Sequence, residues 1–137
     1  ERRFRLLPGD RTTLYVGTQL WVRLLDTDDR ILAEMPTFRL SDTWFGPSTR
    51  EGELCYASRT NARTKLEEIP TRPARALTEV RLTNRTRKAL EFERLKVPIA
   101  RLALLRGENG RHLTQGLSVK CNATGDLDVT VQLWSFP

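Results

Sequence analysis

Cysteine and histidine are scarce in this chain of 137 residues. The two cysteines, Cys55 and Cys121, are too few and too far apart to define a disulfide scaffold, so we expect two reduced, buried thiols. A single bridge between strands remains an alternative. The only histidine is His112, and no close pair of Cys or His ligands exists, which argues against a zinc site. We expect no metal, no cofactor and no catalytic residues.

Long apolar runs are also absent. No run approaches the roughly 20 residues that cross a bilayer, so we expect no membrane span. The start "ERRFRLLPGD" lacks the apolar segment of a signal peptide. Together with the reduced thiols, this favours a cytoplasmic protein. The length fits one domain over residues 1–137.

No segment has a helical period, whereas alternation with a period of two is widespread. Its clearest examples are "HLTQGLSVKC" and "DLDVTVQLWSF", which flank the turn "NATGD" and predict an antiparallel hairpin. The other expected strands cover residues 12–25, 30–35, 37–40, 76–83 and 90–97.

Several connections carry their own signals. "TNRT" is expected to turn the strand 76–83 back on itself, with a β-bulge near Glu93 where the apolar phase slips. Residues 60–74 are polar with two prolines and predict a long connection. Residues 99–106 favour a strand over a helical turn, because "GENG" follows as a hairpin turn. Asn84 and Asn122 open Asn-x-Thr sequons, which we interpret as turn residues.

About eight short strands separated by turns predict an all-β fold, an antiparallel β-sandwich. A partly open β-barrel is the alternative. The immunoglobulin pattern is missing, since no Trp follows Cys55 at a suitable distance and no Tyr lies two residues before Cys121.

Two stretches, "TWFGPSTREGELCYA" and "ALTEVRLTNRTRKALEFERLKVP", resemble the prokaryotic domain-of-unknown-function family four-three-two. The likeness covers roughly residues 12–105. It implies a β-rich domain and brings no activity, cofactor or catalytic residue. The matching positions are Gly46, Gly52, Cys55, Val80, Leu82, Asn84, Thr86 and Val97.

Cys55 is one candidate for chemistry. A thiol nucleophile needs a base, and His112 with Asp126 or Asp128 as its orienting carboxylate would supply one if the strands brought them together. A buried structural thiol explains the same residue, and we favour that interpretation. A thiol-dependent enzyme is therefore kept as an alternative function.

Positive charge is a second candidate, because the formal net charge is +6. A basic cluster on the strands around "TNRT" could bind a polyanion such as nucleic acid. Single-strand binders add aromatic stacking platforms, and only Phe92 is available here. A salt-bridged surface is the favoured alternative. The candidate polyanion-binding residues are Arg85, Arg87, Lys88, Arg94 and Lys96.

Aromatic side chains on the face opposite the expected core are the third candidate. Tyr15, Trp21, Trp134 and Phe136 are either buried under a loop or in a central strand, or they form a surface for a protein partner or a second copy. The leading hypothesis is a non-enzymatic interaction or oligomerisation domain that uses these residues.

Overall fold

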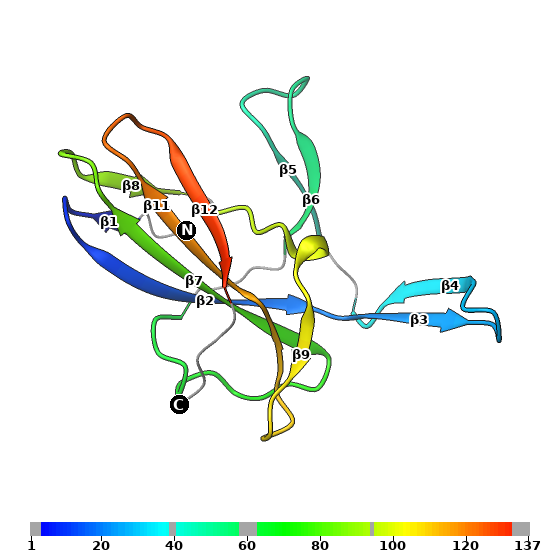
Figure 1. Cartoon of the computed structure of the whole chain (residues 1–137). Helices are drawn as coiled ribbons and strands as arrows, with labels where there is room; N and C mark the ends of the chain where they lie inside the picture. The colour runs from blue at the N-terminus through cyan, green and yellow to red at the C-terminus, as the bar shows by residue number, and fades with distance from the viewer. Residues whose placement is uncertain (1–3, 39–40, 58–62, 94, 133–137) are drawn as a thin grey trace.

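The computed structural model describes residues 4–38, 41–57, 63–93 and 95–132. It is all β apart from one turn of 3₁₀ helix, and its largest sheet curls like a half-barrel with small two-stranded sheets around it (Figure 1). The prediction of an all-β sandwich or partly open barrel is confirmed. The elements are β1 (Phe4–Leu6), β2 (Arg11–Gln19), β3 (Trp21–Leu25), β4 (Ile31–Pro36), β5 (Ser41–Phe45), β6 (Glu53–Ala57), β7 (Arg75–Asn84), β8 (Leu90–Phe92), η1 (Ile99–Arg101), β9 (Leu104–Arg106), β10 (His112–Thr114), β11 (Gly116–Cys121) and β12 (Leu127–Gln132).

Strand β7 is the centre of the largest sheet. Strand β2 pairs antiparallel along one edge of it, and β10 and β11 pair in succession along the other edge. Strand β12 continues the sheet beyond β11, and β9 continues it beyond β10. The hairpins predicted around "NATGD" and "GENG" are both present, as β11–β12 and β9–β10.

The pairing of β7 with β10 and β11 is parallel, which differs from the antiparallel arrangement expected throughout. Parallel neighbours need a long crossover, and residues 85–111 supply it here. The register changes by one residue between the pairs Leu77–Leu113 and Val80–Leu117. An extra residue is therefore accommodated near Gln115, as in a β-bulge.

Strand β8 does not return along β7, and this corrects the expected hairpin around "TNRT". It pairs antiparallel with β1 in a separate two-stranded sheet, because both edges of β7 are already occupied. The strand also ends at Phe92, and residues 95–98 are not in a strand, so the expected bulge near Glu93 is wrong. Residues 99–106 combine the two alternatives, since η1 precedes the short strand β9.

The main core lies between β7, β11 and the β1–β8 pair. Alternate side chains of β7, such as Val80 and Leu82, pack with Leu117 and Val119 and with Leu6 from β1. The rings of Phe4 and Phe92 stack at 5.3 Å and join β1 to β8. This pair therefore covers one face of the large sheet.

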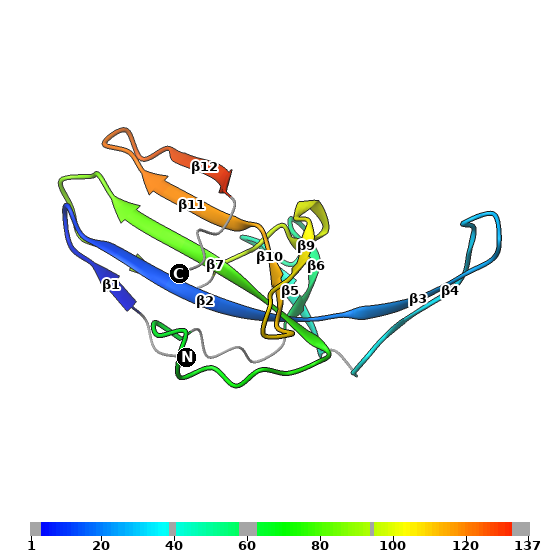
Figure 2. The same cartoon turned by 60° about the horizontal axis from the view of Figure 1, so that its bottom comes forward.

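A smaller core lies on the opposite face, around Leu77 and Leu113. Leu66 and Ile69 from the connection at residues 63–74 pack onto it, and this connection runs along the sheet as Figure 2 shows. Arg111 holds the connection in place, since its Nη2 donates to the carbonyl oxygen of Ile69 at 2.7 Å. The prediction of a long connection is confirmed for its described part.

Asn84, at the end of β7, is a fully buried polar hub. Its Nδ2 donates to the carbonyl oxygens of Leu6 and Lys88, each at 2.9 Å. Its Oδ1 accepts from the backbone N–H and the hydroxyl of Thr86, at 2.9 and 2.8 Å. The side chain thus shapes the turn after β7 and fastens β1 to it, which confirms its interpretation as a turn residue.

Two hairpins, β3–β4 and β5–β6, extend away from the large sheet (Figures 1 and 2). In β5–β6 the strands meet at two glycines, and Gly52 has a positive φ of 153°. A Cβ at Gly52 would lie 2.6 Å from the carbonyl oxygen of Phe45, and one at Gly46 would collide with the Glu51 backbone. The "FGPSTREG" stretch is therefore a tight structural turn.

Candidate functional site

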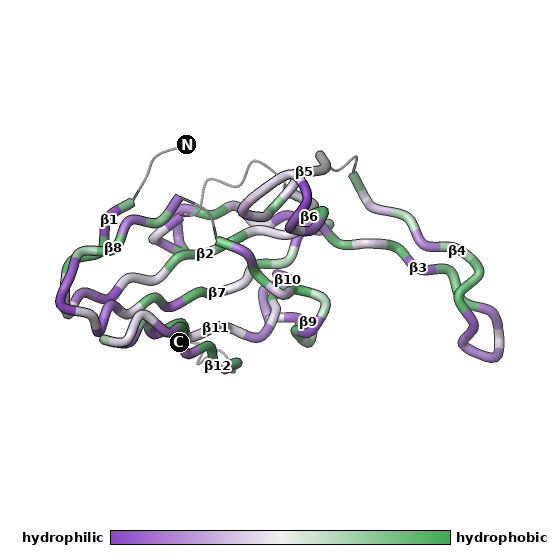
Figure 3. Tube along the Cα trace, turned by 90° about the horizontal axis from the view of Figure 1, so that it is seen from above, coloured by the Kyte–Doolittle hydropathy of each residue, from purple (hydrophilic) through white to green (hydrophobic). Residues whose placement is uncertain are grey.

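The β3–β4 hairpin, residues 21–36, exposes several large apolar side chains on a projecting pair of strands; we call it the arm. Its large apolar side chains are between 41% and 62% exposed, although they lie in regular strands. Figure 3 shows hydrophobic stretches on the arm far from the sheet. Exposed apolar patches of several hundred Å² usually mark interaction sites. The exposed apolar side chains of the arm are Trp21, Val22, Leu24, Leu25, Ile31, Leu32 and Met35.

The two faces of the arm differ. The cross-strand pairs Val22–Met35 and Leu24–Ala33 make one face entirely apolar. The Arg23–Glu34 pair lies on the other face, joined by an ion pair of 3.1 Å between Nε and Oε2. One face thus offers only apolar contact, while the other adds a pair of opposite charges.

The base of the arm is fixed to the sheet by hydrogen bonds. The carbonyl oxygen of Leu20 accepts from the backbone N–H and the hydroxyl of Thr37, at 3.1 and 2.7 Å. The Leu20 N–H donates to the carbonyl oxygen of Ala74 at 3.0 Å. These bonds close the hairpin where it leaves the sheet, beyond the end of β2.

The aromatic residues predicted to bind a partner lie in different places. Trp21 is on the arm, whereas Tyr15 is half-buried and packs on the smaller core. Burial and the nearby carboxylates of Glu79 and Glu67 raise the pKa of Tyr15. Trp134 and Phe136 lie outside the described residues. Tyr15 and Trp21 are separated because the strand expected over residues 12–25 is divided at Leu20 into β2 and β3.

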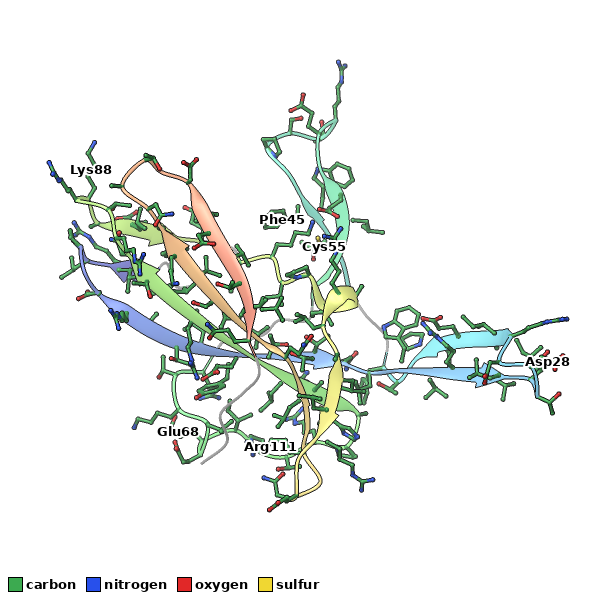
Figure 4. The ribbon with its side chains drawn as sticks, viewed as in Figure 1. Asp28, Phe45, Cys55, Glu68, Lys88 and Arg111 are labelled. Atoms are coloured by element: carbon green, nitrogen blue, oxygen red, sulfur yellow. The ribbon has the colours of Figure 1, made fainter. Side chains whose placement is uncertain are left out.

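The residues predicted to bind a polyanion are also dispersed. Arg87 and Lys88 lie in the exposed turn before β8, and Figure 4 shows Lys88 at its tip. Lys96 pairs with Glu53 of β6. Arg94 lies outside the described residues. The expected cluster depended on a β7–β8 hairpin that does not form. Of its members within the described residues, only Arg85 lines a polar depression on the large sheet.

A shallow polar depression of about 300 Å³ lies on the face of the large sheet away from β1 and β8. Its cationic members come from three strands and the turn after β7. Sequence reasoning did not select Arg11 and Lys120, because register alone brings them beside β7. The lining residues are Arg11, Thr12, Thr13, Arg81, Leu82, Thr83, Arg85, Ser118, Lys120 and Gln132.

The thiol hypothesis finds little support in the placement of its residues. Cys55 lies on β6, which pairs with β5, while His112 lies on β10 between β7 and β9 (Figure 4 labels Cys55). Asp128 is the cross-strand partner of Lys120, and Lys120 follows His112 by eight residues, which corresponds to roughly 25 Å of extended chain. Asp126 lies farther along, in the turn between β11 and β12. The structure therefore brings His112 together with neither of the two carboxylates proposed to orient it.

Both cysteines are free, and Cys121 is buried in β11. Burial raises the pKa of the Cys121 thiol, which keeps it protonated and unreactive. Cys121 ends β11 and His112 begins β10, nine residues earlier in extended chain, so the two side chains are too far apart to share a metal ion. In the described parts of the chain, no group of three His, Cys, Asp or Glu side chains is placed to hold a metal.

Within the described ranges, no helix is long and apolar enough to span a membrane. Comparisons with curated proteins and with solved structures gave no match. A family model described as "Protein of unknown function (DUF432)" matches residues 1–132. This confirms the resemblance and extends it beyond the stretches that carried it. The chain belongs to the DUF432 family.

Proposed function

We propose that this chain is a non-enzymatic interaction domain that associates with a second copy of itself through the arm. The observation that carries the proposal is a projecting β-hairpin whose apolar side chains remain exposed on both faces. An isolated two-stranded hairpin is marginally stable at best in water. Packing against another surface would stabilise it and remove its apolar side chains from solvent.

A second copy suits the arm for two reasons. In the described chain both strands of the arm are edge strands, so each offers unpaired backbone groups to another strand. A two-fold axis would place the identical apolar faces of two copies against each other, while the Arg23–Glu34 ion pair of each copy would stay on the outer face.

The test is the mass in solution, measured by size-exclusion chromatography with light scattering at tens of micromolar. We expect wild type to run as a dimer or larger assembly, and the double variant Val22→Ser, Leu24→Ser to run as a monomer. These side chains are exposed, so the variant should keep its circular dichroism spectrum.

The matched control is Leu104→Ser on β9. Leu104 is as exposed as Val22, at 53%, yet it lies away from the arm. This variant should keep the mass of wild type. A wild-type chain that is monomeric throughout the concentration range overturns the proposal, and so does an assembly that survives the double variant.

A further inference from the structure

We infer that the polar depression on the large sheet binds a phosphate-type oxyanion with more than one negative charge, such as a pyrophosphate group. This inference is independent of self-association through the arm. It starts from the register of three strands. Thr83 of β7 is the direct cross-strand neighbour of Arg11 on β2 and of Lys120 on β11.

Two further cations come from β7 and from the turn that follows it. Arg81 precedes Thr83 by two residues and points to the same face, and Arg85 follows it by two. All four cationic side chains line the depression. Neighbouring strands are about 4.8 Å apart, and two residues of a strand span about 6.6 Å. Four cations therefore surround the Thr83 hydroxyl at distances that their long side chains can cover.

The charges around Thr83 are poorly balanced inside the protein. Arg81 pairs with Glu79, with 3.0 Å between Nη2 and Oε2. Among the described residues, no carboxylate lies within ion-pair distance of Arg11, Arg85 or Lys120. Like charges gathered on one sheet face repel each other. An anion over Thr83 would relieve this repulsion, which makes its binding favourable.

The lining chemistry selects the ligand. Arginine guanidinium groups match the oxygen pairs of phosphate and carboxylate groups, and several cations favour an anion with several charges. The hydroxyl groups of Thr13 and Ser118 add neutral hydrogen-bonding groups beside Arg81, their cross-strand neighbour. Among residues 4–132 as far as the structure describes them, no aromatic side chain lines the depression, so this part of the chain offers no stacking platform of the kind that nucleic-acid bases require. The site therefore fits the phosphate part of a ligand.

Arg81 is positioned more tightly than the other three cations. Glu79 holds its Nη2 through both carboxylate oxygens, at 3.3 and 3.0 Å, while Arg81 remains exposed enough to reach the depression. This leaves other N–H groups of the guanidinium available to a ligand. Two carboxylates lower the net charge of the site, since Glu79 pairs with Arg81 and Asp128 is the cross-strand neighbour of Lys120. Four cations and two carboxylates leave an excess of about two positive charges.

The experiment titrates the full chain with sodium pyrophosphate by isothermal calorimetry at low salt, with inorganic phosphate as a second probe. We expect saturable binding of one pyrophosphate per chain, weaker binding of phosphate, and a clear loss of affinity when sodium chloride is raised. Arg85→Gln and Lys120→Gln should each weaken pyrophosphate binding about tenfold, the usual scale for a charge-assisted hydrogen bond.

The matched control is Arg87→Gln. Arg87 is an exposed arginine in the same turn as Arg85, outside the depression. It should change the affinity less than twofold. Equal losses in the Arg85 and Arg87 variants overturn the site, because they would indicate general attraction to a basic protein. Absence of pyrophosphate binding at millimolar concentration, with a wild-type circular dichroism spectrum, overturns it as well.

A single-stranded DNA oligonucleotide separates this site from the extended surface expected at first. If the DNA binds more tightly than pyrophosphate and loses affinity in Arg87→Gln and Lys88→Gln, the turn before β8 is the binding surface and the inference is wrong. If pyrophosphate binds and competes with any DNA binding, and Arg87→Gln and Lys88→Gln leave both unchanged, the depression is confirmed as the site.

Discussion

Strand β7 and the arm are both rich in apolar residues in alternating patterns, yet they end in opposite environments. In β7 the side chains of Thr78, Val80, Leu82 and Asn84 are at most 1% exposed. On the arm, those of Val22 and Leu24 are more than half exposed. Alternation therefore identifies a strand without telling whether anything covers its apolar face.

The difference arises from neighbours. Strand β7 is paired along both edges, and it is covered on one face by β1 and β8 and partly on the other by residues 63–74. The strands of the arm pair only with each other among the described residues. Burial of apolar surface stabilises β7, whereas the arm would gain the same stabilisation only from a surface packed against it, such as the second copy proposed above.

We expect the largest loss of stability from a substitution at Asn84, at the buried end of β7. Asn84→Ala removes the donors to the carbonyl oxygens of Leu6 and Lys88 in a fully buried position, and we expect a loss of about 4 kcal/mol in the free energy of unfolding, measured in urea. Asn122→Ala is the matched control, since Asn122 also opens an Asn-x-Thr sequence but lies in the β11–β12 turn. Its loss should stay below about 1 kcal/mol. Equal losses would contradict the role of Asn84 as a hub.

The same leucine truncation should have different effects in the two regions. Leu82→Ala creates a cavity in the main core and should lower the free energy of unfolding by about 3 kcal/mol. Leu24→Ala, at a side chain 57% exposed, should cost less than about 0.5 kcal/mol at concentrations where the chain is monomeric. Urea unfolding of both variants at low micromolar concentration checks this. A large loss for Leu24→Ala in the monomer would mean that the arm is part of the core.

The two cysteine thiols differ in burial, and we expect them to differ in reactivity. Cys121 is buried in β11 and its pKa is raised, whereas Cys55 is half-buried on β6. We expect iodoacetamide to modify Cys55 in the native protein at least about tenfold faster than Cys121, because only the thiolate reacts. The pKa of Cys121 is raised in the folded state, so its contribution to stability is full below pH 9.0 and falls as pH rises through the higher folded value. Faster labelling of Cys121 would contradict its burial.

Local patterns predicted much of the fold. The turn residues of "NATGD" and "GENG" and the alternation around them identified the hairpins that close the large sheet. The partner of β8 was wrong, because local alternation does not show which edges of β7 are occupied. The cationic site was predicted only in part. Arg85 was selected because basic residues lie near it in the sequence, whereas Arg11 and Lys120 come from strands far away in the chain and were missed.

The all-β class, the positions of most turns and the family can be read from the sequence, because they depend on residues close together in the chain. The parallel pairing of β7 with β10 and β11, the exposure of the arm and the gathering of four cations around Thr83 become visible only in the folded chain. Each of these depends on long-range register, which local patterns do not encode. A shift of one residue would move Arg11 or Lys120 to the opposite face of the sheet.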